Sequence, residues 1–298
     1  MSEAPSSLRP IATVFVIGSG IMGRGIAAQA ALGGHTVWVE DVRPDLAEQG
    51  AADARRMLER AAARQGLSAE TLHQAQQRIR VAPQLADCAE ADLVIEAAPE
   101  KLGLKQDLFA SVEDLAKASA ILASNTSSLP IGQIGERLTD PGRLIGLHFF
   151  NPVLQMPLVE LIPSPRTRPE VTARAEGFAR GLGKTVVHSA DRPGFVTTRA
   201  LAALLNEAIG MLEEGVATRD DIDTAYKLGF HHPLGPFELA DLVGLDTALA
   251  ILEVLREGLQ DPRYEARPML RRLVAEGKLG RKTGEGFYRY PPTKDRPP

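Results

Sequence analysis

The segment Thr13–Asp41 constrains the fold of this chain more than any other stretch. It begins with Val14–Ile17, an apolar run rich in β-branched residues that is typical of a buried strand. Gly18, Gly20 and Gly23 follow in the spacing GxGxxG. The first glycine permits a tight turn, the second lets backbone approach a pyrophosphate, and the third lets the following helix pack against the sheet. The segment therefore predicts a dinucleotide-binding βαβ unit.

A glycine-rich turn also occurs without any ligand, so the context of the motif matters. A helix through Ala27–Leu32 and a second strand, Thr36–Val39, follow the glycines, and Asp41 comes eighteen positions after Gly23. An acid at this place binds the ribose hydroxyls of NAD, and its charge repels the 2′-phosphate of NADP. Arg43 lies nearby and keeps NADP as an alternative. The context favours NAD.

Composition narrows the class of protein and its partners. The chain has 298 residues, 44% of them hydrophobic, which is enough for a large buried core. Its net charge of -4 arises from 34 basic and 38 acidic side chains, so nucleic acid is not an expected partner. No apolar run reaches the roughly 20 residues that span a membrane, and Met1–Pro10 does not resemble a secretory signal. We therefore expect a cytoplasmic protein that does not bind membranes.

The order of apolar runs and helical patterns predicts the architecture. Helical spacing over Asp45–Leu67 and Ser68–Arg80 follows the first unit, and Lys105–Lys117 and Pro169–Gly181 are further predicted helices. Strand-length apolar runs lie between and beyond them, at Ala91–Ala97, Ala120–Ser124, Leu144–Leu147, Leu158–Ile162 and Thr185–Val187. This alternation predicts an α/β fold of the Rossmann type with a mostly parallel sheet.

The sequence changes character after Asp191–Gly194, where strand-like runs end. Ala200–Glu214 has the spacing of an amphipathic helix, and helical periodicity continues to about Gly277. We therefore expect a Rossmann-type domain over residues 1–190 and an all-helical domain over 191–298. The apolar stripe of Ala200–Glu214 is suited to burial either inside this domain or against a second copy of the chain.

Polar residues near the ends of three predicted strands are candidates for chemistry. His148 follows a run in the Leu144 strand, Glu160 ends an apolar run of the next strand, and Ser127 comes just after Ala120–Ser124. In parallel sheets ligands bind at the carboxyl ends of strands. An imidazole held by a carboxylate can remove a proton from an alcohol. Together with NAD, this predicts hydride transfer from a secondary alcohol.

Other interpretations of these residues stay open at this point. A histidine among apolar residues is more often a structural core residue than a base. A Ser, His and Glu set also occurs in hydrolases, but no GxSxG motif surrounds Ser127. His231 and His232 form a predicted loop pair without the spacing of a metal site, and Cys88 is the one cysteine, so we expect no metal and no internal disulfide.

Longer motifs in this chain resemble those of the 3-hydroxyacyl-CoA dehydrogenases. The resemblance extends along nearly the whole sequence, and the order and spacing of the motifs make it specific. The motifs are VIGSGIMGRGIA at Val16–Ala27, SNTSSLPI at Ser124–Ile131, GLHFFNP at Gly146–Pro152, PLVELI at Pro157–Ile162, DRPGF at Asp191–Phe195, HPLGPFELADLVGLD at His232–Asp246 and GRKTGEGFYRY at Gly280–Tyr290.

The resemblance implies roles for individual residues. His148 would be the catalytic base, Glu160 the acid that orients it, and Ser127 a hydrogen-bond donor to the substrate oxygen. The residues implied for NAD binding are Gly18, Gly20, Ile21, Met22, Gly23, Asp41, Glu100, Lys105, Ser127, Asn151 and Lys282. The implied reaction is NAD-dependent oxidation of a short-chain (S)-3-hydroxyacyl-CoA and its reverse, in fatty-acid β-oxidation, by a homodimer.

The substrate is less constrained than the cofactor. Arg60 and Arg64 lie one helical turn apart and with Ser127 are the candidates for contact with the acyl-CoA, although a solvated basic face explains the two arginines equally well. Relatives have an asparagine near the catalytic histidine where this chain has Thr198. This departure keeps two alternatives open: a dehydrogenase of non-CoA hydroxy acids such as L-gulonate or carnitine, and a dinucleotide-binding protein without catalytic activity.

Overall fold

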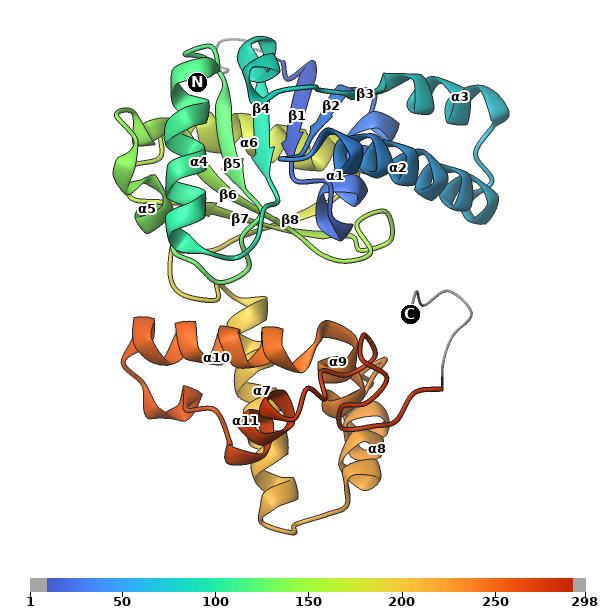
Figure 1. The fold of residues 1–298 in the computed structure, drawn as a ribbon, viewed down its shortest axis with the longest axis vertical. Coiled ribbons are helices and arrows are strands. Elements are labelled where there is room, and N and C mark those ends of the chain that lie inside the picture. Colours follow the sequence, from blue (N-terminus) through green and yellow to red (C-terminus); the bar gives the residue numbers. More distant parts are fainter. Residues whose placement is uncertain (1–9, 292–298) are drawn as a thin grey trace, which may run out of the picture. The chain divides into compact units, whose positions relative to one another are not determined.

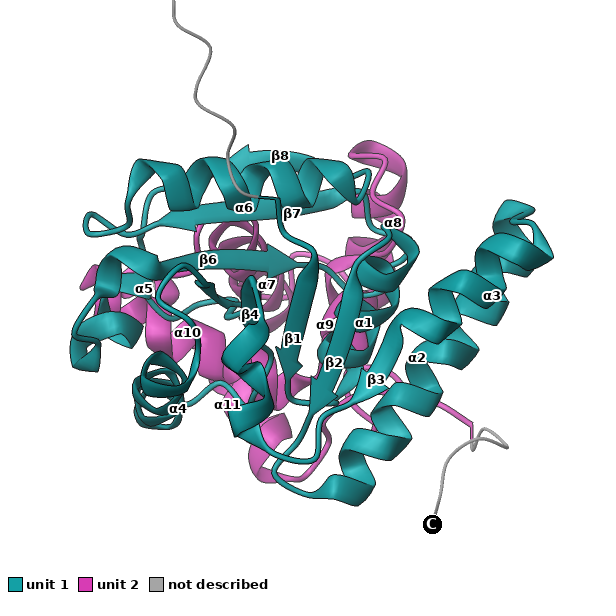
Figure 2. Cartoon of the chain, turned by 90° about the horizontal axis from the view of Figure 1, so that it is seen from above, with its two compact units in different colours: residues 1–192 teal, residues 193–298 magenta. Residues whose placement is uncertain are grey.

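The computed structural model describes residues 10–291, and the chain divides into two compact units, residues 1–192 and residues 193–298 (Figure 2). The segment Met1–Pro10, for which the sequence predicts no secretory signal, lies outside the described residues except for Pro10. Within the described part of the chain, every helix is too short or too polar to traverse a bilayer.

Unit 1 is built on one eight-stranded sheet in the order β3-β2-β1-β4-β5-β6-β7-β8 (Figure 1). Neighbouring strands run parallel except for β6 and β7, which are antiparallel. This confirms the expected α/β fold with a mostly parallel sheet. The strands are β1 (Thr13–Ile17), β2 (Thr36–Glu40), β3 (Ile79–Val81), β4 (Leu93–Glu96), β5 (Ile121–Ser124), β6 (Leu144–Phe149), β7 (Leu158–Pro163) and β8 (Thr185–His188).

Helices cover both faces of this sheet, with α4 and α6 on opposite sides of it (Figure 1). The α-helices of unit 1 are α1 (Ile21–Leu32), α2 (Pro44–Gln65), α3 (Ala69–Arg78), α4 (Leu102–Leu115), α5 (Ile131–Ile134) and α6 (Pro169–Gly181). The short 3-10 turns are η1 (Leu85–Glu90), η2 (Gly135–Arg137) and η3 (Pro141–Arg143).

The hydrophobic core of unit 1 lies mainly between the sheet and helices α1, α2 and α6. Helix α1 approaches closely because its buried positions are small: Ala27, Ala28 and Ala30 are all 0% exposed. At Gly25 a Cβ atom would come within 2.8 Å of the Val153 side chain, so only glycine leaves room for this contact. The contact fixes the loop between β6 and β7 on helix α1.

The region Ser68–Arg80 differs from the single helix that its spacing predicts. Ser68 caps the helix as expected, because its side chain accepts a hydrogen bond from the Thr71 N–H group. Helix α3 nevertheless ends at Arg78, and Ile79–Val81 forms strand β3, which pairs in parallel with β2. The β-branched Ile79 gains burial in the sheet that a further helical turn would not provide.

Unit 2 is helical, as expected, and has its own core. It contains α7 (Thr197–Glu213), α8 (Arg219–Gly229), α9 (Pro236–Val243), α10 (Leu245–Leu259), η4 (Pro262–Tyr264) and α11 (Pro268–Ala275). The chain after α11 is held by the buried Asp241 of α9, whose carboxylate accepts hydrogen bonds from the N–H groups of Phe287 and Tyr288.

Hydrogen bonds from α5 hold Asp191, near the end of unit 1. The Asp191 carboxylate accepts hydrogen bonds from the N–H groups of Ile131 at 2.6 Å and Gly132 at 2.7 Å. Both donors belong to the first turn of α5, so Asp191 satisfies backbone groups that have no partner inside the helix. The last residues of unit 1 are thus tied to the start of α5.

Candidate functional site

Four buried polar side chains lie on one face of the sheet, near the edge where strands β4, β5 and β6 end. Side chains alternate between the two faces of a strand, and the neighbours of these residues belong to the core with α1 and α6. The four therefore face the opposite side. They are Glu96 of β4, Ser124 of β5, His148 of β6 and Glu160 of β7, and each is 5% exposed or less.

His148 and Glu160 form a hydrogen-bonded pair. They are opposite each other in the antiparallel register of β6 and β7, and His148 Nδ1 lies 2.8 Å from Glu160 Oε2. Since the carboxylate accepts, Nδ1 carries the proton and the lone pair is on Nε2. The Phe150 ring packs on the imidazole with centroids 4.4 Å apart. The pair has the geometry that proton abstraction from an alcohol requires.

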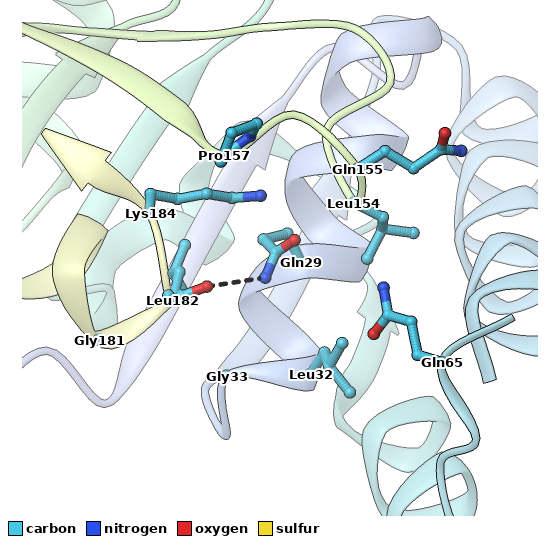
Figure 3. Close-up of a pocket in the computed structure, with 11 residues that line it drawn as sticks. Gln29, Leu32, Gly33, Gln65, Leu154, Gln155, Pro157, Gly181, Leu182 and Lys184 are labelled. Carbon is cyan, nitrogen blue, oxygen red and sulfur yellow. Dashed lines mark hydrogen bonds between the residues drawn. The ribbon is translucent and has the colours of Figure 1, made fainter.

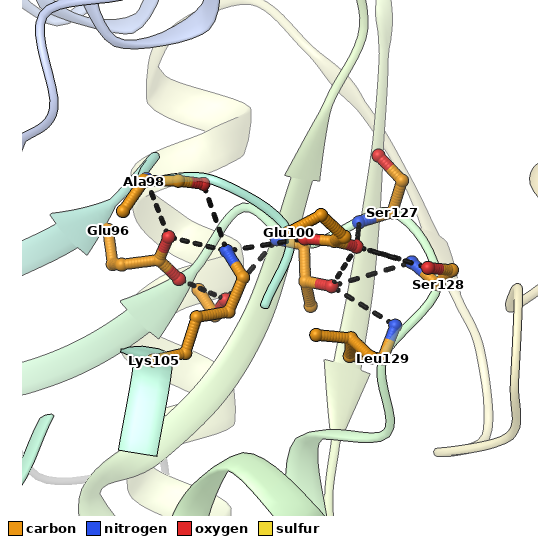
Figure 4. A network of polar contacts seen from close by, with 9 residues as sticks. Glu96, Ala98, Glu100, Lys105, Ser127, Ser128 and Leu129 are labelled. Carbon is orange, nitrogen blue, oxygen red and sulfur yellow. Dashed lines mark hydrogen bonds and ion pairs between the residues drawn. The ribbon is translucent and has the colours of Figure 1, made fainter. Parts of the chain in front are cut away.

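Ser127 lies on a loop that Glu100 holds by its backbone (Figure 4). Glu100 Oε1 accepts hydrogen bonds from the N–H groups of Ser127 at 3.0 Å and Ser128 at 3.1 Å, and from the hydroxyls of Thr126 and Ser128. The Ser127 side chain points away from Glu100 (Figure 4). The loop is thereby fixed without use of the Ser127 hydroxyl.

Lys105 links Glu100 to Glu96. Its Nζ lies 2.5 Å from Glu96 Oε1 and 3.3 Å from Glu100 Oε2 (Figure 4). Although burial of the Glu100 carboxyl opposes ionisation, the charge of Lys105 and the hydrogen bonds from the 126–128 loop hold the pKa of Glu100 below its usual value. Glu100, Lys105 and the loop that carries Ser127 are thus brought together.

The glycine-rich turn fits a dinucleotide. Gly18 has φ +92°, and a Cβ atom on Gly23 would come within 1.7 Å of the Gly18 carbonyl oxygen, so both positions require glycine. Gly20 is different, because a Cβ atom there would meet nothing within 4 Å. Gly20 caps α1 and has no side chain to bond the first N–H groups of the helix. The turn therefore presents open space at a helix N-terminus, where a pyrophosphate binds.

Asp41 lies directly after β2 and contacts this turn. Its Oδ2 accepts hydrogen bonds from the Ser19 N–H group at 2.8 Å and from the Ser19 hydroxyl at 2.7 Å. A carboxylate at this place can bind ribose hydroxyls with its other oxygen. Arg43, the residue that kept NADP open, forms an ion pair with Asp45 at the start of α2.

Two asparagines lie near the end of β6: Asn151 follows this strand in the chain, and Asn125 follows the neighbouring strand β5. Asn151 is exposed, in the loop after Phe150, and is joined to Pro152 by a cis peptide bond. Asn125 is buried, and its Oδ1 accepts a hydrogen bond from the Phe149 N–H group at 2.9 Å. Sequence reasoning missed Asn125 as a support of this strand end, although its place directly after a buried strand was a usable signal.

The remaining predicted residues are not part of this cluster in unit 1. Arg60 and Arg64 are exposed on α2. Thr198 lies in the first turn of α7, in unit 2. Lys282 also belongs to unit 2, where its ammonium pairs with Asp246 at 2.5 Å.

No group of three or more His, Cys, Asp or Glu side chains among residues 10–291 is arranged to hold a metal ion. Cys88 is buried, and burial raises the pKa of its thiol to about 11. The thiol is therefore protonated at neutral pH and is a poor ligand and nucleophile.

A cavity of about 410 Å³ lies elsewhere in unit 1, where the C-terminal ends of α1, α2 and α6 meet the loop before β7 (Figure 3). Lys184 is its charged lining residue, and its Nζ donates hydrogen bonds to the carbonyls of Val153 and Met156. The lysine therefore has a structural explanation, and the cavity contains none of the predicted site residues.

Comparison with known proteins places these features in context. Residues 13–192 match the family model described as 3-hydroxyacyl-CoA dehydrogenase, NAD binding domain, and residues 194–290 match the model for the 3-hydroxyacyl-CoA dehydrogenase C-terminal domain. The chain is 45% identical to a 3-hydroxybutyryl-CoA dehydrogenase of Bradyrhizobium diazoefficiens, over 96% of this chain and 98% of the relative. It is 42% identical to the human mitochondrial hydroxyacyl-coenzyme A dehydrogenase, over 97% and 95% of the two chains.

Solved structures agree with the sequence comparison. The crystal structure of an (S)-3-hydroxybutyryl-CoA dehydrogenase from Ralstonia eutropha superposes with a TM-score of 0.90 at 39% identity. The match covers 95% of this chain and 100% of the other.

Proposed function

Because the chain belongs to the 3-hydroxyacyl-CoA dehydrogenase family and is an NAD-dependent oxidoreductase, we propose that it oxidises short-chain (S)-3-hydroxyacyl-CoA to 3-ketoacyl-CoA and catalyses the reverse reaction. The observation that carries this proposal is the buried His148–Glu160 pair, with Nδ1 and Oε2 2.8 Å apart. A separate set of contacts, to Glu100, holds the Ser127 loop near the carboxyl edge of the sheet.

His148 acts as the general base in this proposal. Its Nε2 takes the proton of the substrate hydroxyl as the C3–H bond breaks. Glu160, which is fully buried, stabilises the imidazolium that forms and fixes the ring in the tautomer that leaves Nε2 able to accept. The Ser127 hydroxyl donates a hydrogen bond to the substrate oxygen as it becomes a carbonyl.

When bound, NAD would supply the acceptor for the hydride that leaves C3. The residues that would hold it fit the group: the turn Gly18–Gly23 leaves space for the pyrophosphate at the α1 N-terminus, and Asp41 binds ribose hydroxyls. Ile21 and Met22 provide N–H groups at the first turn of that helix. Asn151 and Glu100 would line the cofactor on the nicotinamide side, and Lys282 of unit 2 would contact it as well.

The finer points of the proposal concern substrate and assembly. Arg60 and Arg64 are exposed on one face of α2 and would meet phosphates of the CoA moiety.

We propose a homodimer formed through the helical unit, which would also contribute to the substrate cleft, and residence in the cytoplasm. Exposed apolar residues of unit 2, such as Val216, Leu228 and Phe230, support burial of part of its surface.

Oxidation of NADH with different keto substrates tests the proposal. Acetoacetyl-CoA should be reduced with a kcat/KM at least about a hundredfold above that for free acetoacetate, since CoA contacts contribute binding energy to the transition state. Preference for a free keto acid would instead identify a dehydrogenase of non-CoA hydroxy acids, for which Thr198 is the motivating residue. Reduction of neither, with NADH still bound, would contradict catalytic activity of this kind.

A further inference from the structure

We infer that Glu96 is a positioning residue for the proposed reaction: acting through Lys105 and Glu100, it fixes the backbone of the Ser127 loop. The inference rests on the role proposed for Ser127. Glu96 itself lies at the carboxyl end of β4 and is fully buried. A fully buried carboxylate at a ligand-binding edge needs strong compensation, and its partners lead directly to the loop.

Both oxygens of Glu96 are used. Oε1 accepts hydrogen bonds from Lys105 Nζ at 2.5 Å and from the Ala98 N–H group at 2.7 Å, while Oε2 accepts one from the Ser124 hydroxyl at 2.6 Å. Ser124 is the register partner of Glu96 on the adjacent strand. The carboxylate is therefore held by three donors from β5, α4 and the segment that follows β4.

Lys105 is placed by this carboxylate. Its side chain is 1% exposed, and the ammonium has three acceptors: Glu96 Oε1 at 2.5 Å, the Ala98 carbonyl at 3.3 Å and Glu100 Oε2 at 3.3 Å. An ammonium offers three protons, so this set accounts for all of them. The shortest contact is with Glu96, and the nitrogen stays close to that residue rather than to Glu100.

Glu100 in turn depends on where Lys105 stands. Its Oε2 faces the ammonium, and its Oε1 accepts the four hydrogen bonds of the 126–128 loop. A carboxylate is planar, so rotating one oxygen toward the ammonium moves the other away from the loop. Glu96 prevents this rotation because it keeps the ammonium at a distance from Glu100.

The substitution Glu96→Gln removes the negative charge of this side chain while nearly keeping its shape. The two N–H donors at Oε1 require an acceptor, so the amide oxygen takes that place and the NH2 group faces the Ser124 hydroxyl, which can accept. The shape and the two hydrogen bonds at Oε1 are retained, while the Ser124 hydroxyl loses the acceptor of its proton. Glu100, which keeps its charge, becomes the stronger partner for Lys105. The ammonium then shifts toward Glu100 and releases the Ser127 and Ser128 N–H groups.

Asp92→Asn is the matched control. Asp92 immediately precedes the same strand at its other end, and its carboxylate pairs with Lys117 at 2.7 Å and accepts hydrogen bonds from the N–H groups of Ala12 and Thr13. Like Glu96→Gln, this substitution removes the negative charge from a Lys–carboxylate pair of unit 1. It does so at the end of β4 that lies away from the Ser127 loop. It therefore reports how the loss of such a pair affects folding alone.

The experiment compares the wild type and both variants by steady-state kinetics with acetoacetyl-CoA and by amide hydrogen exchange. Glu96→Gln should lower kcat at least about tenfold, as expected for a lost hydrogen bond to a charged group, and raise exchange of the Ser127 and Ser128 amides at least about fivefold. The Kd for NADH should change less than kcat does, because the glycine turn and Asp41 are untouched, although Glu100 and Lys105 on the nicotinamide side shift. Asp92→Asn should change neither kcat nor exchange at these amides.

Unchanged kcat and unchanged exchange in Glu96→Gln would overturn the inference. If that variant does not fold, Glu96→Asp replaces it, since it keeps the charge but draws the carboxylate back from Lys105 by one methylene group. It should raise exchange at the same amides, and no change would overturn the inference. Ser124→Ala is unsuitable, because the Ser124 hydroxyl also accepts a hydrogen bond from the Thr126 N–H group of the loop. Exchange is measured without substrate. A wild type that does not reduce acetoacetyl-CoA therefore contradicts the proposed function, while the exchange data still decide whether Glu96 holds the loop.

Discussion

His148 and Glu160 stand opposite each other across the antiparallel pairing of β6 and β7, with Nδ1 and Oε2 2.8 Å apart. The two residues are 12 positions apart in the chain. The reversal of the chain after β6 lets a short connection bring them face to face, whereas parallel strands need a longer crossover. The pair is therefore built into the sheet itself, which limits the reorganisation needed during proton transfer.

His148→Gln should lower kcat by about 10²–10⁴-fold, the usual contribution of a general base. The Kd for NADH should stay nearly the same, because the glutamine leaves the glycine turn intact. Stopped-flow or steady-state reduction of acetoacetyl-CoA measures the effect. His188→Gln is the control, since His188 also pairs with a carboxylate, Glu176, but is exposed on β8. Equal losses in the two variants would contradict a catalytic role of His148.

Asp41→Ala should raise the KM for NADH about tenfold or more with little change in kcat. The substitution removes the carboxylate that would bind the ribose and that accepts hydrogen bonds from the Ser19 N–H group and hydroxyl. Loss of a hydrogen bond to a charged group weakens binding by about tenfold or more. Asp45→Ala, which removes the exposed partner of Arg43, should have little effect. A KM for NADH that is the same in Asp41→Ala and the wild type would rule out the ribose contact.

Alanine substitutions at two glycines of the turn should have different effects, one on NADH binding and the other on stability. Gly20→Ala should leave the thermal midpoint within a few degrees, because the new methyl group meets nothing within 4 Å, yet weaken NADH binding by filling space near the pyrophosphate. Gly23→Ala should lower the thermal midpoint strongly, since its Cβ would overlap the Gly18 carbonyl oxygen at 1.7 Å. Thermal unfolding and NADH fluorescence titration measure both. Normal NADH binding by Gly20→Ala would contradict the assigned place of the phosphates.

Glu100 should make stability depend on pH in the acid range. Its pKa is lowered in the folded protein from the ordinary value of 4.5, because Lys105 and the loop donors outweigh the effect of burial. A lowered pKa stabilises the folded state above about pH 4.5, and this contribution is lost as pH falls through the folded-state pKa.

Urea unfolding from pH 7 to pH 3 checks this dependence. Glu100→Gln should be less stable than the wild type at pH 7, and the difference should shrink below pH 4.5. Glu48→Gln, at an exposed site of α2, should show no such convergence. A stability difference for Glu100→Gln that is constant over this range would contradict the assigned ionisation.

Much of the fold could be predicted from the sequence, because local patterns determine it. The β-branched run before Gly18 and the amphipathic spacing of α7 each identify one element from neighbouring residues alone. Strand β3 could not be predicted in this way, since Ile79 and Val81 gain their stability from pairing with β2, which is distant in the chain.

The site was predictable only where a residue type indicates its chemistry. His148 and Glu160 stood out because an imidazole and a carboxylate near strand ends suggest proton transfer. Glu96 did not, because its role depends on Lys105 one turn into α4 and on Ser124 across the sheet. Neither contact has a signature in sequence spacing, because each arises only when the strands and α4 pack together.

The clamp of Asp191 on the start of α5 has a mechanical consequence. The chain crosses from one unit to the other just after this residue, and the clamp grips the N–H groups of Ile131 and Gly132. The backbone joins this segment to β8, and the Asp191 side chain adds a second link, to the stretch that follows Ser127 in the chain. A displacement of the crossing segment would therefore reach the start of α5 through two hydrogen bonds as well as β8 through the backbone.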